Sequence, residues 1–92
     1  MSVTVRLPSQ LRSLVGGTSD VVVEASTVRD ALSALEAKYP GVATRIVDDG
    51  GQIRRFVNVF VADEDVRFLD GLETVLTAGT TISIVPAVAG GL

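Results

Sequence analysis

The side chains that are available for chemistry set the first limits on function. The sequence of 92 residues contains no cysteine and no histidine. Disulfides, thiolate metal sites and cysteine-based catalysis are therefore excluded, and the commonest general base is missing. Any chemistry must use carboxylates, hydroxyl groups, amines or the end of the chain.

Two acidic runs are the first candidates. Asp63-Glu64-Asp65 invites a metal-binding or acid–base interpretation. However, three consecutive carboxylates cannot converge on an ion without further ligands, and EF-hand spacing does not follow. Asp48-Asp49-Gly50-Gly51 lacks the Gly-Lys-Ser/Thr continuation of a phosphate-binding loop. Both runs are predicted to be solvated turns, and no metal site is predicted.

The end of the chain is the third candidate. The apolar pair Ile84-Val85 is followed by Pro86, then by small residues and by Gly90-Gly91. A terminal carboxylate has a pKa of about 3.5, so at neutral pH it is ionised and must be activated before it can react as an electrophile. Glycine has no Cβ and lets a backbone pass through a narrow channel. A diglycine can also be a frayed end with no role.

Composition and charge restrict the partners. Eight basic and eleven acidic residues give a net charge of −3, and Arg54-Arg55 is the only adjacent basic pair. This balance argues against nucleic acid as the main partner. The first ten residues do not resemble a targeting signal, and the apolar runs are too short to span a bilayer. A cytoplasmic protein without a membrane partner is expected.

The first third of the chain predicts two strands and a helix. Alternation at residues 3–7 and a valine run at 21–23 indicate strands, joined by a long connection whose apolar residues close one end of the core. Those residues are Leu11, Leu14 and Val15. Residues 28–39 then follow helical spacing, with Ser26 or Thr27 as the N-cap and Pro40-Gly41 as the stop. Asp30, three residues after Thr27, gives a pattern like a capping box.

The remainder predicts a helical turn at 42–47, a strong strand at 56–61, a tight turn and a short strand at 66–68. A helical turn within 70–79 and a strand at 80–85 follow, and Pro86 is expected to release the tail from the sheet. The order β-β-α-β-β-β gives an α+β fold, a mixed sheet with one helix packed on one face. A domain at 1–86 and a flexible tail at 87–92 are expected.

This pattern resembles the ubiquitin-like sulfur-carrier family that includes the MoaD and ThiS types, which have the β-grasp fold. The match of element order extends over essentially the whole chain. The segment 55–68, RFVNVFVADEDVRF, and the ending PAVAGG are most similar to the CysO type, which serves cysteine biosynthesis. The resemblance implies a protein substrate and not an enzyme.

The resemblance also implies a reaction. An E1-like enzyme that uses ATP and Mg²⁺ would adenylate the carboxylate of Gly91, and sulfur transfer would give a thiocarboxylate there. No cofactor would be bound by the chain itself. The extended tail would span up to about 17 Å to reach the partner's enclosed site. A sulfur-acceptor biosynthetic enzyme would be the second partner.

The residues that would contact these partners follow from the same resemblance. In the strand at 56–61, the valines would face the helix with Ile82 and Ile84, and an outward apolar patch would remain beside the tail. The expected partner-binding residues are Gly90, Ala89, Val88, Val85, Phe60 and Phe56. For Phe56, a place in the core remains an alternative.

Leu92 departs from the family pattern, because its amide bond occupies the carboxylate of Gly91. Either a protease removes Leu92, for which the resemblance implies a zinc-dependent peptidase, or Leu92 is not part of the natural chain.

Three functions remain open. A sulfur carrier can serve cysteine, thiazole, molybdopterin, or thiosugar and other secondary pathways. A ubiquitin-like modifier would be joined to lysines of target proteins through Gly91, and self-linked chains would be limited to Lys38 or the N-terminus. A simple β-grasp interaction module with an inert tail is the third.

Overall fold

The computed structural model describes residues 1–55 and 57–86. Five strands form one mixed sheet in the order β2-β1-β5-β3-β4, in which β1 and β5 are parallel and the other neighbours are antiparallel. The strands are β1 Ser2–Arg6, β2 Asp20–Glu24, β3 Val57–Val61, β4 Glu64–Asp65 and β5 Thr81–Pro86. The helical elements are α1 Ser9–Arg12, η1 Ser13–Val15, α2 Val28–Lys38, η2 Ala43–Arg45, η3 Val66–Phe68 and η4 Gly71–Glu73.

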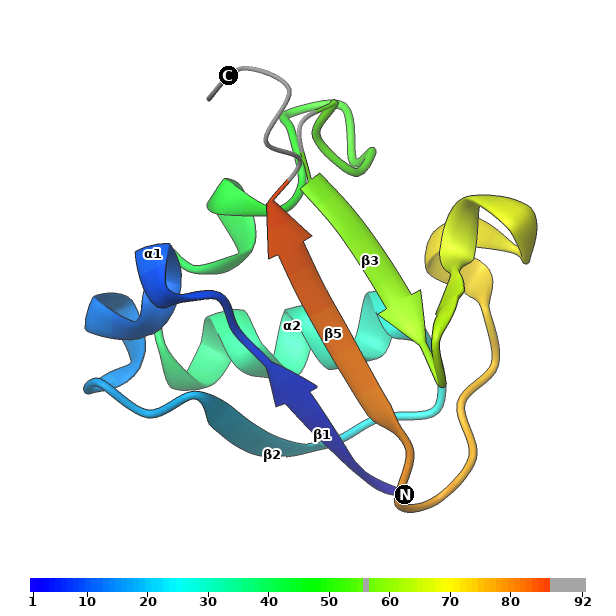
Figure 1. Cartoon of the computed structure of the whole chain (residues 1–92), viewed down its shortest axis with the longest axis horizontal. Coiled ribbons are helices and arrows are strands. Elements are labelled where there is room, and N and C mark those ends of the chain that lie inside the picture. The colour runs from blue at the N-terminus through cyan, green and yellow to red at the C-terminus, as the bar shows by residue number, and fades with distance from the viewer. Residues whose placement is uncertain (56, 87–92) are drawn as a thin grey trace.

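Helix α2 lies across one face of the sheet, as Figure 1 shows. It begins where the side chain of Thr27 accepts a hydrogen bond from the backbone N–H of Asp30, at 3.1 Å. Asp30 also places a carboxylate at the positive end of the helix dipole. Leu32 and Leu35 are buried. The predicted helix at 28–39 is therefore confirmed, although Tyr39 forms its C-terminal cap and not its last turn.

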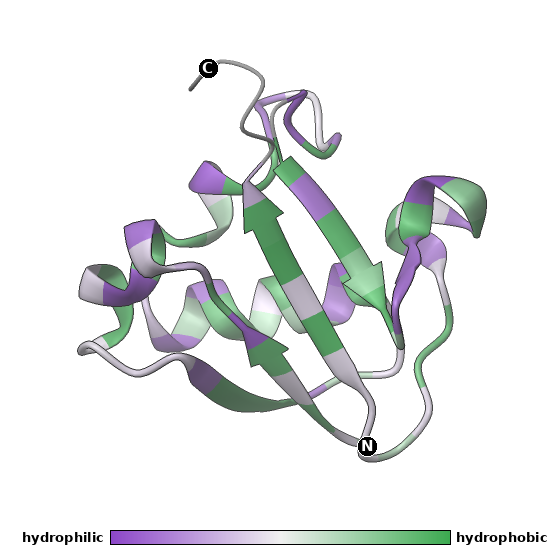
Figure 2. Cartoon of the chain, viewed as in Figure 1, coloured by the Kyte–Doolittle hydropathy of each residue, from purple (hydrophilic) through white to green (hydrophobic). Residues whose placement is uncertain are grey.

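Alternation along the strands separates the two faces of the sheet. Figure 2 shows apolar and polar residues alternating along β1 and β5. The residues Val5, Val59 and Ile82 are fully buried, and Ile84 is nearly so. Their neighbours along each strand point to the opposite face. Because aromatic residues are rare in the chain, the core consists mainly of valine, leucine, isoleucine and alanine.

The connection between β1 and β2 closes one end of this core, as predicted. It contains α1 and η1, which the sequence pattern did not indicate. Leu11 and Val15 are buried there, and Leu14 is partly buried against the core. At the other side of α2, Val42 and Ile46 flank η2 and are also buried, which agrees with the predicted helical turn at 42–47.

The predicted short strand at 66–68 is wrong, because the strand is β4 and residues 66–68 form the 3-10 helix η3. The carboxylate of Asp65 accepts a hydrogen bond from the backbone N–H of Arg67, at 2.8 Å, and caps this helix. The buried side chain of Val66 fixes it to the core. A cap and one anchoring residue outweigh the weak strand propensity of so short a segment.

Candidate functional site

The base of the tail is held at the last register pair of the sheet. In the antiparallel pairing of β3 with β5, Val57 is the partner of Pro86, and Val59 is the partner of Ile84. The strand therefore runs one residue beyond the predicted end at Val85. Proline has no N–H to donate to a neighbouring strand, which suits it to the end of a ladder. Pro86 is the last residue of β5, so the predicted tail begins at this corner.

A small hollow lies at the same corner. Its volume is about 170 Å³. Its lining residues come from α1 and the residue before it, from η2, and from the strands β3 and β5. Its lining residues are Pro8, Gln10, Leu11, Arg45, Val57, Ile84 and Pro86. The lining is mostly apolar, and Arg45 is its one charged residue. None of these lining residues is suited to acid–base or nucleophilic catalysis.

The outer face of the sheet is the surface that α2 leaves uncovered. Register places Arg6, Ser83 and Phe60 side by side in one row, on β1, β5 and β3. Asp20 and Asp65 extend the row at its two ends. Phe60 is partly buried in this row. Val85 is 41% exposed and lies opposite Asn58 on the same face.

One ion pair joins the outer ends of β1 and β2. The guanidinium of Arg6 donates to both carboxylate oxygens of Asp20, at 3.1 and 3.3 Å. This hydrogen bonding lowers the pKa of Asp20 and raises the pKa of Arg6. Both side chains are exposed to solvent, so the pair orders the sheet edge but adds little to stability.

Arg67 connects η3 to the base of the tail. β4 pairs only with Phe60 and Val61, so it leaves the first part of β3 without a neighbouring strand on that side. The Arg67 guanidinium donates to the carbonyl of Val57 at 2.7 Å and to the side-chain oxygen of Asn58 at 2.8 Å. It also reaches the carbonyl of Arg54 at 3.2 Å. Arg67 thereby occupies the uncovered edge of β3.

The two acidic runs differ from each other: residues 48–51 form a turn as predicted, whereas in the run 63–65 only Asp63 lies in the turn and Glu64–Asp65 form β4. Ala62 and Asp63 have positive φ angles of 51° and 72° and form the two-residue connection between β3 and β4. In the other run, the carboxylate of Asp48 accepts hydrogen bonds from the backbone N–H groups of Gly50 and Gln52. Within residues 1–55 and 57–86, no group of three or more acidic residues is placed to hold a metal ion.

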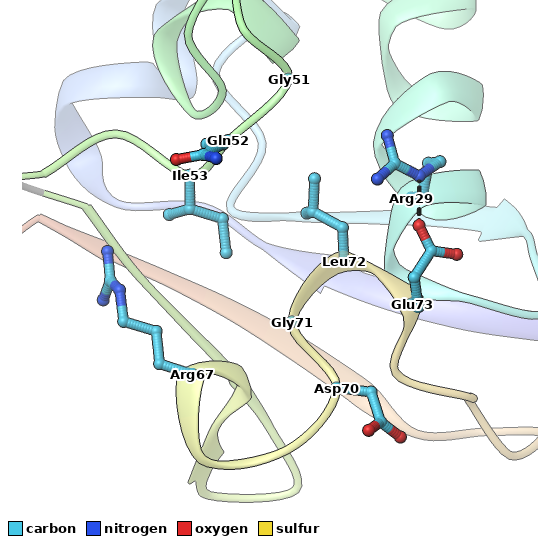
Figure 3. A pocket seen from close by; sticks show the side chains of 9 residues that line it. All are labelled: Arg29, Gly51, Gln52, Ile53, Arg67, Asp70, Gly71, Leu72 and Glu73. Atoms are coloured by element: carbon cyan, nitrogen blue, oxygen red, sulfur yellow. Dashed lines mark hydrogen bonds and ion pairs between the residues drawn. The ribbon is translucent and has the colours of Figure 1, made fainter.

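A larger hollow of about 370 Å³ lies between η4, the loop at 51–53 and the start of α2. Figure 3 shows Arg29 and Glu73 joined across one side of it, at 2.6 Å. Arg67 and Asp70 line the same hollow, but the carboxylate of Asp70 points away from it. The ion pair neutralises the charges that could act there, so this hollow does not resemble a catalytic centre.

The predicted site residues divide into two groups. The structure brings Phe60 and Val85 to the same outer face of neighbouring strands. The residues Phe56, Val88, Ala89, Gly90 and Gly91 lie outside the described residues. Sequence reasoning missed Arg67 and Phe68, because both were assigned to a strand. Asp65 could have indicated the turn, because an aspartate side chain often accepts a hydrogen bond from the backbone N–H two residues later.

The fold and the site together define a small ubiquitin-like protein with the β-grasp architecture. In the part of the chain that the structure describes, no helix is long and apolar enough to cross a membrane. The mixed sheet and the single long helix packed on one face confirm the predicted class of fold, whereas the last short strand lies at Glu64–Asp65 and β5 extends to Pro86.

The chain belongs to the ThiS family, whose model matches residues 5–91. It is 45% identical to the sulfur carrier protein CysO of Mycobacterium tuberculosis, over 99% of this chain and 100% of that protein. It is 39% identical to the small archaeal modifier protein 3 of Haloferax volcanii, with the same coverage. The crystal structure of the Amycolatopsis orientalis BexX/CysO complex contains a similar chain, with 43% identity and a TM-score of 0.90, covering 97% of this chain and 99% of that one.

Proposed function

We propose that this chain is a sulfur carrier that is adenylated and then thiocarboxylated at Gly91 and delivers sulfide to a biosynthetic enzyme. The observation that carries the proposal is the 45% identity to a sulfur carrier protein along nearly the whole chain. The chain acts as a protein substrate, in which residues 1–86 form the recognised domain and residues 87–92 the reactive tail. Cysteine synthesis is the favoured destination because of the likeness to CysO.

The reaction uses ATP and Mg²⁺ on an E1-like enzyme. A carboxylate oxygen of Gly91 bonds to the α-phosphorus of ATP, and pyrophosphate leaves with the electrons of the broken P–O bond. Hydrosulfide then forms a C–S bond with the acyl carbon while the C–O bond to AMP breaks. AMP leaves with the electrons of that bond, and loss of the proton from sulfur gives the thiocarboxylate without any change in oxidation state. The absence of cysteine from the sequence fits this chemistry, since no side-chain thiol competes for the acyl group.

The geometry of the domain supports this role. β5 ends at the Val57–Pro86 pair, and Pro86 lines the hollow that also contains Arg45. Phe60 and Val85 lie on the adjoining outer face. An enzyme that encloses the tail can therefore contact apolar side chains of the domain at the same time, and Val85, Phe60 and Phe56 are the proposed contacts. Val88, Ala89 and Gly90 would line the enclosed path to Gly91.

The carrier needs at least two partners, the adenylating enzyme and a sulfur acceptor. A similar CysO chain forms a complex with BexX, and this supports a role in which the domain binds partner proteins. For the acceptor, thiazole, molybdopterin, and thiosugar or another secondary pathway are the proposed alternatives to cysteine synthesis. Because Leu92 follows Gly91 in the sequence, a peptidase that removes Leu92, of the zinc-dependent class, is a third proposed partner.

A second candidate function is protein modification through Gly91. It is favoured by the 39% identity to a protein named as a small archaeal modifier. Intact-mass spectrometry of the protein from its native host distinguishes the two. A thiocarboxylate, in which sulfur replaces one carboxylate oxygen and raises the mass accordingly, supports the carrier function. Conjugates that leave a Gly-Gly remnant on lysines of other proteins support the modifier function. Finding only the free carboxylate under sulfur-replete growth would count against both.

A further inference from the structure

One apolar side chain lies far outside both the core and the outer face of the sheet. Phe68 is 86% exposed, the highest value among the large apolar residues that the structure describes. Leu69, the next residue, is 39% exposed. A single exposed apolar residue is ordinary, but an aromatic ring displayed with an adjacent leucine forms an apolar projection that folding does not require.

The backbone that presents Phe68 is fixed from several directions. Val66 is fully buried, and the carboxylate of Asp65 caps η3. The side chain of Arg67 is anchored on β3, as described above. The hydroxyl of Thr74 accepts a hydrogen bond from the backbone N–H of Asp70 at 3.1 Å, and so holds the residues that follow. The backbone at Phe68 is thus fixed before any partner binds, so binding has to order only the exposed side chain.

The charge of the chain is concentrated around this projection. Residues 63–70 contain four acidic residues and one basic residue. Since the chain has eleven acidic and eight basic residues, the other 84 residues contain seven of each. The entire net charge of −3 therefore belongs to this segment. Asp63, Glu64 and Asp70 are exposed, whereas Asp65 faces Arg67, with the carboxylate 3.7 Å from the guanidinium.

The projection is also tied to the base of the tail. In Figure 1, η3 lies beside β3, on the side away from β5. The same Arg67 side chain contacts the carbonyl of Val57, the residue that pairs with Pro86. A partner that binds Phe68 therefore also fixes the position of Pro86, the last residue of β5. Adenylation needs such control, because an error of about 1 Å in placing the reacting atoms can cost on the order of 100-fold in rate.

We propose that Phe68 and Leu69 are a second anchor, separate from the tail and the outer sheet face, by which the adenylating enzyme holds this domain. The enzyme receives them in an apolar pocket bordered by basic side chains, which complement Asp63, Glu64 and Asp70. This inference rests on the proposed carrier function, since it assigns a surface to that reaction.

The test is ATP–pyrophosphate exchange with the adenylating enzyme of the same organism, using domains that end at Gly91. Phe68→Ser should raise the KM for the domain about tenfold, the loss expected of an aromatic anchor, with kcat changed less than twofold. The matched control is Val75→Ser, because Val75 is 70% exposed but lies outside the acidic segment. Its KM should stay within twofold of wild type. Thermal unfolding of both variants should match wild type, since neither side chain is buried.

A second pair of variants tests the charge. Glu64→Gln combined with Asp70→Asn should lower kcat/KM at low salt and flatten its dependence on ionic strength. Asp49→Asn removes one exposed carboxylate elsewhere and should leave the salt dependence unchanged.

Three outcomes would overturn the inference. Unchanged KM for Phe68→Ser is the first. The second is an effect of Phe68→Ser confined to the sulfur-acceptor enzyme, which would assign the surface to another partner. The third is self-association of the wild-type domain that Phe68→Ser abolishes. If the wild-type domain ending at Gly91 shows no exchange at all, the carrier proposal itself fails, and this inference fails with it.

Discussion

Val57 and Pro86 form the last register pair between β3 and β5, and Pro86 is the last residue of β5. The base of the tail is thereby fixed by two strands, while β3 itself is held by the Arg67 side chain. Whatever encloses the tail must start from this corner, so the distance from Pro86 to the reacting carboxylate is set by the number of residues between them. This relationship makes the length of the tail testable.

We predict that the 92-residue form is not adenylated and that the form ending at Gly91 is. With Leu92 present, the terminal carboxylate is displaced by about 3.5 Å and carried by a branched residue. A shift of that size moves it away from the α-phosphate of ATP, where about 1 Å can already cost on the order of 100-fold in rate. A form ending at Gly90 is too short and should also fail.

ATP–pyrophosphate exchange with a cognate E1-like enzyme measures all three forms. Equal exchange by the forms ending at Gly91 and Leu92 would show that trimming is not required. Exchange by none of them would contradict the carrier proposal.

The second prediction concerns the core under α2. Leu35 is fully buried on the sheet-facing side of the helix. Leu35→Ala should lower the free energy of unfolding by about 2–5 kcal/mol, through lost burial and the cavity left behind. Urea denaturation followed by circular dichroism measures the change. Val22→Ala, at a position 57% exposed on β2, serves as the control and should change the free energy by less than about 0.5 kcal/mol. A loss below about 1 kcal/mol for Leu35→Ala would contradict its core position.

The third prediction concerns the outer face. Phe60→Asp should leave the domain folded, because Phe60 points away from α2, but should weaken binding to the adenylating enzyme or the acceptor by about tenfold or more. Isothermal titration calorimetry with each enzyme measures the affinity. Val22→Asp introduces the same charge on the same face at the far edge of the sheet, and should bind as wild type does. Unfolding of Phe60→Asp would show that its side chain supports the core.

The fourth prediction is a pH dependence. The hydrogen bonds from Arg6 lower the pKa of Asp20 in the folded state. The stabilisation is therefore present above the unfolded-state pKa of about 4 and disappears as the pH falls through the lower folded-state value. Compared with wild type, Asp20→Asn should be slightly less stable at pH 7, and this difference should shrink progressively as the pH falls below the unfolded-state pKa of about 4. Urea denaturation at several pH values provides the measurement, and a difference that grows on acidification would contradict the assigned sign.

The sequence by itself determined the helix, the order of elements and the class of fold. Periodicity was sufficient there, because the helical spacing at residues 28–39 and the alternation at 3–7 and 80–85 are local, and the strands formed within one residue of these bounds. The site at Gly91 was implied by the family resemblance, and it stays a prediction because Gly91 lies outside the described residues.

Only the tertiary structure decided how the segment from Asp65 to Phe68 behaves. Locally, Val66 and Phe68 alternate with Arg67 and predict a strand, yet Val66 is fully buried and Phe68 is 86% exposed. The difference depends on β3, whose uncovered edge offers acceptors to Arg67 from residues nine to thirteen positions earlier in the chain. Contacts over that separation carry no periodic signal. The exposure of Phe68 and the fixed position of Pro86 therefore depend on the pairing of β3 with β5 and on the contacts of Arg67, which the local sequence does not encode.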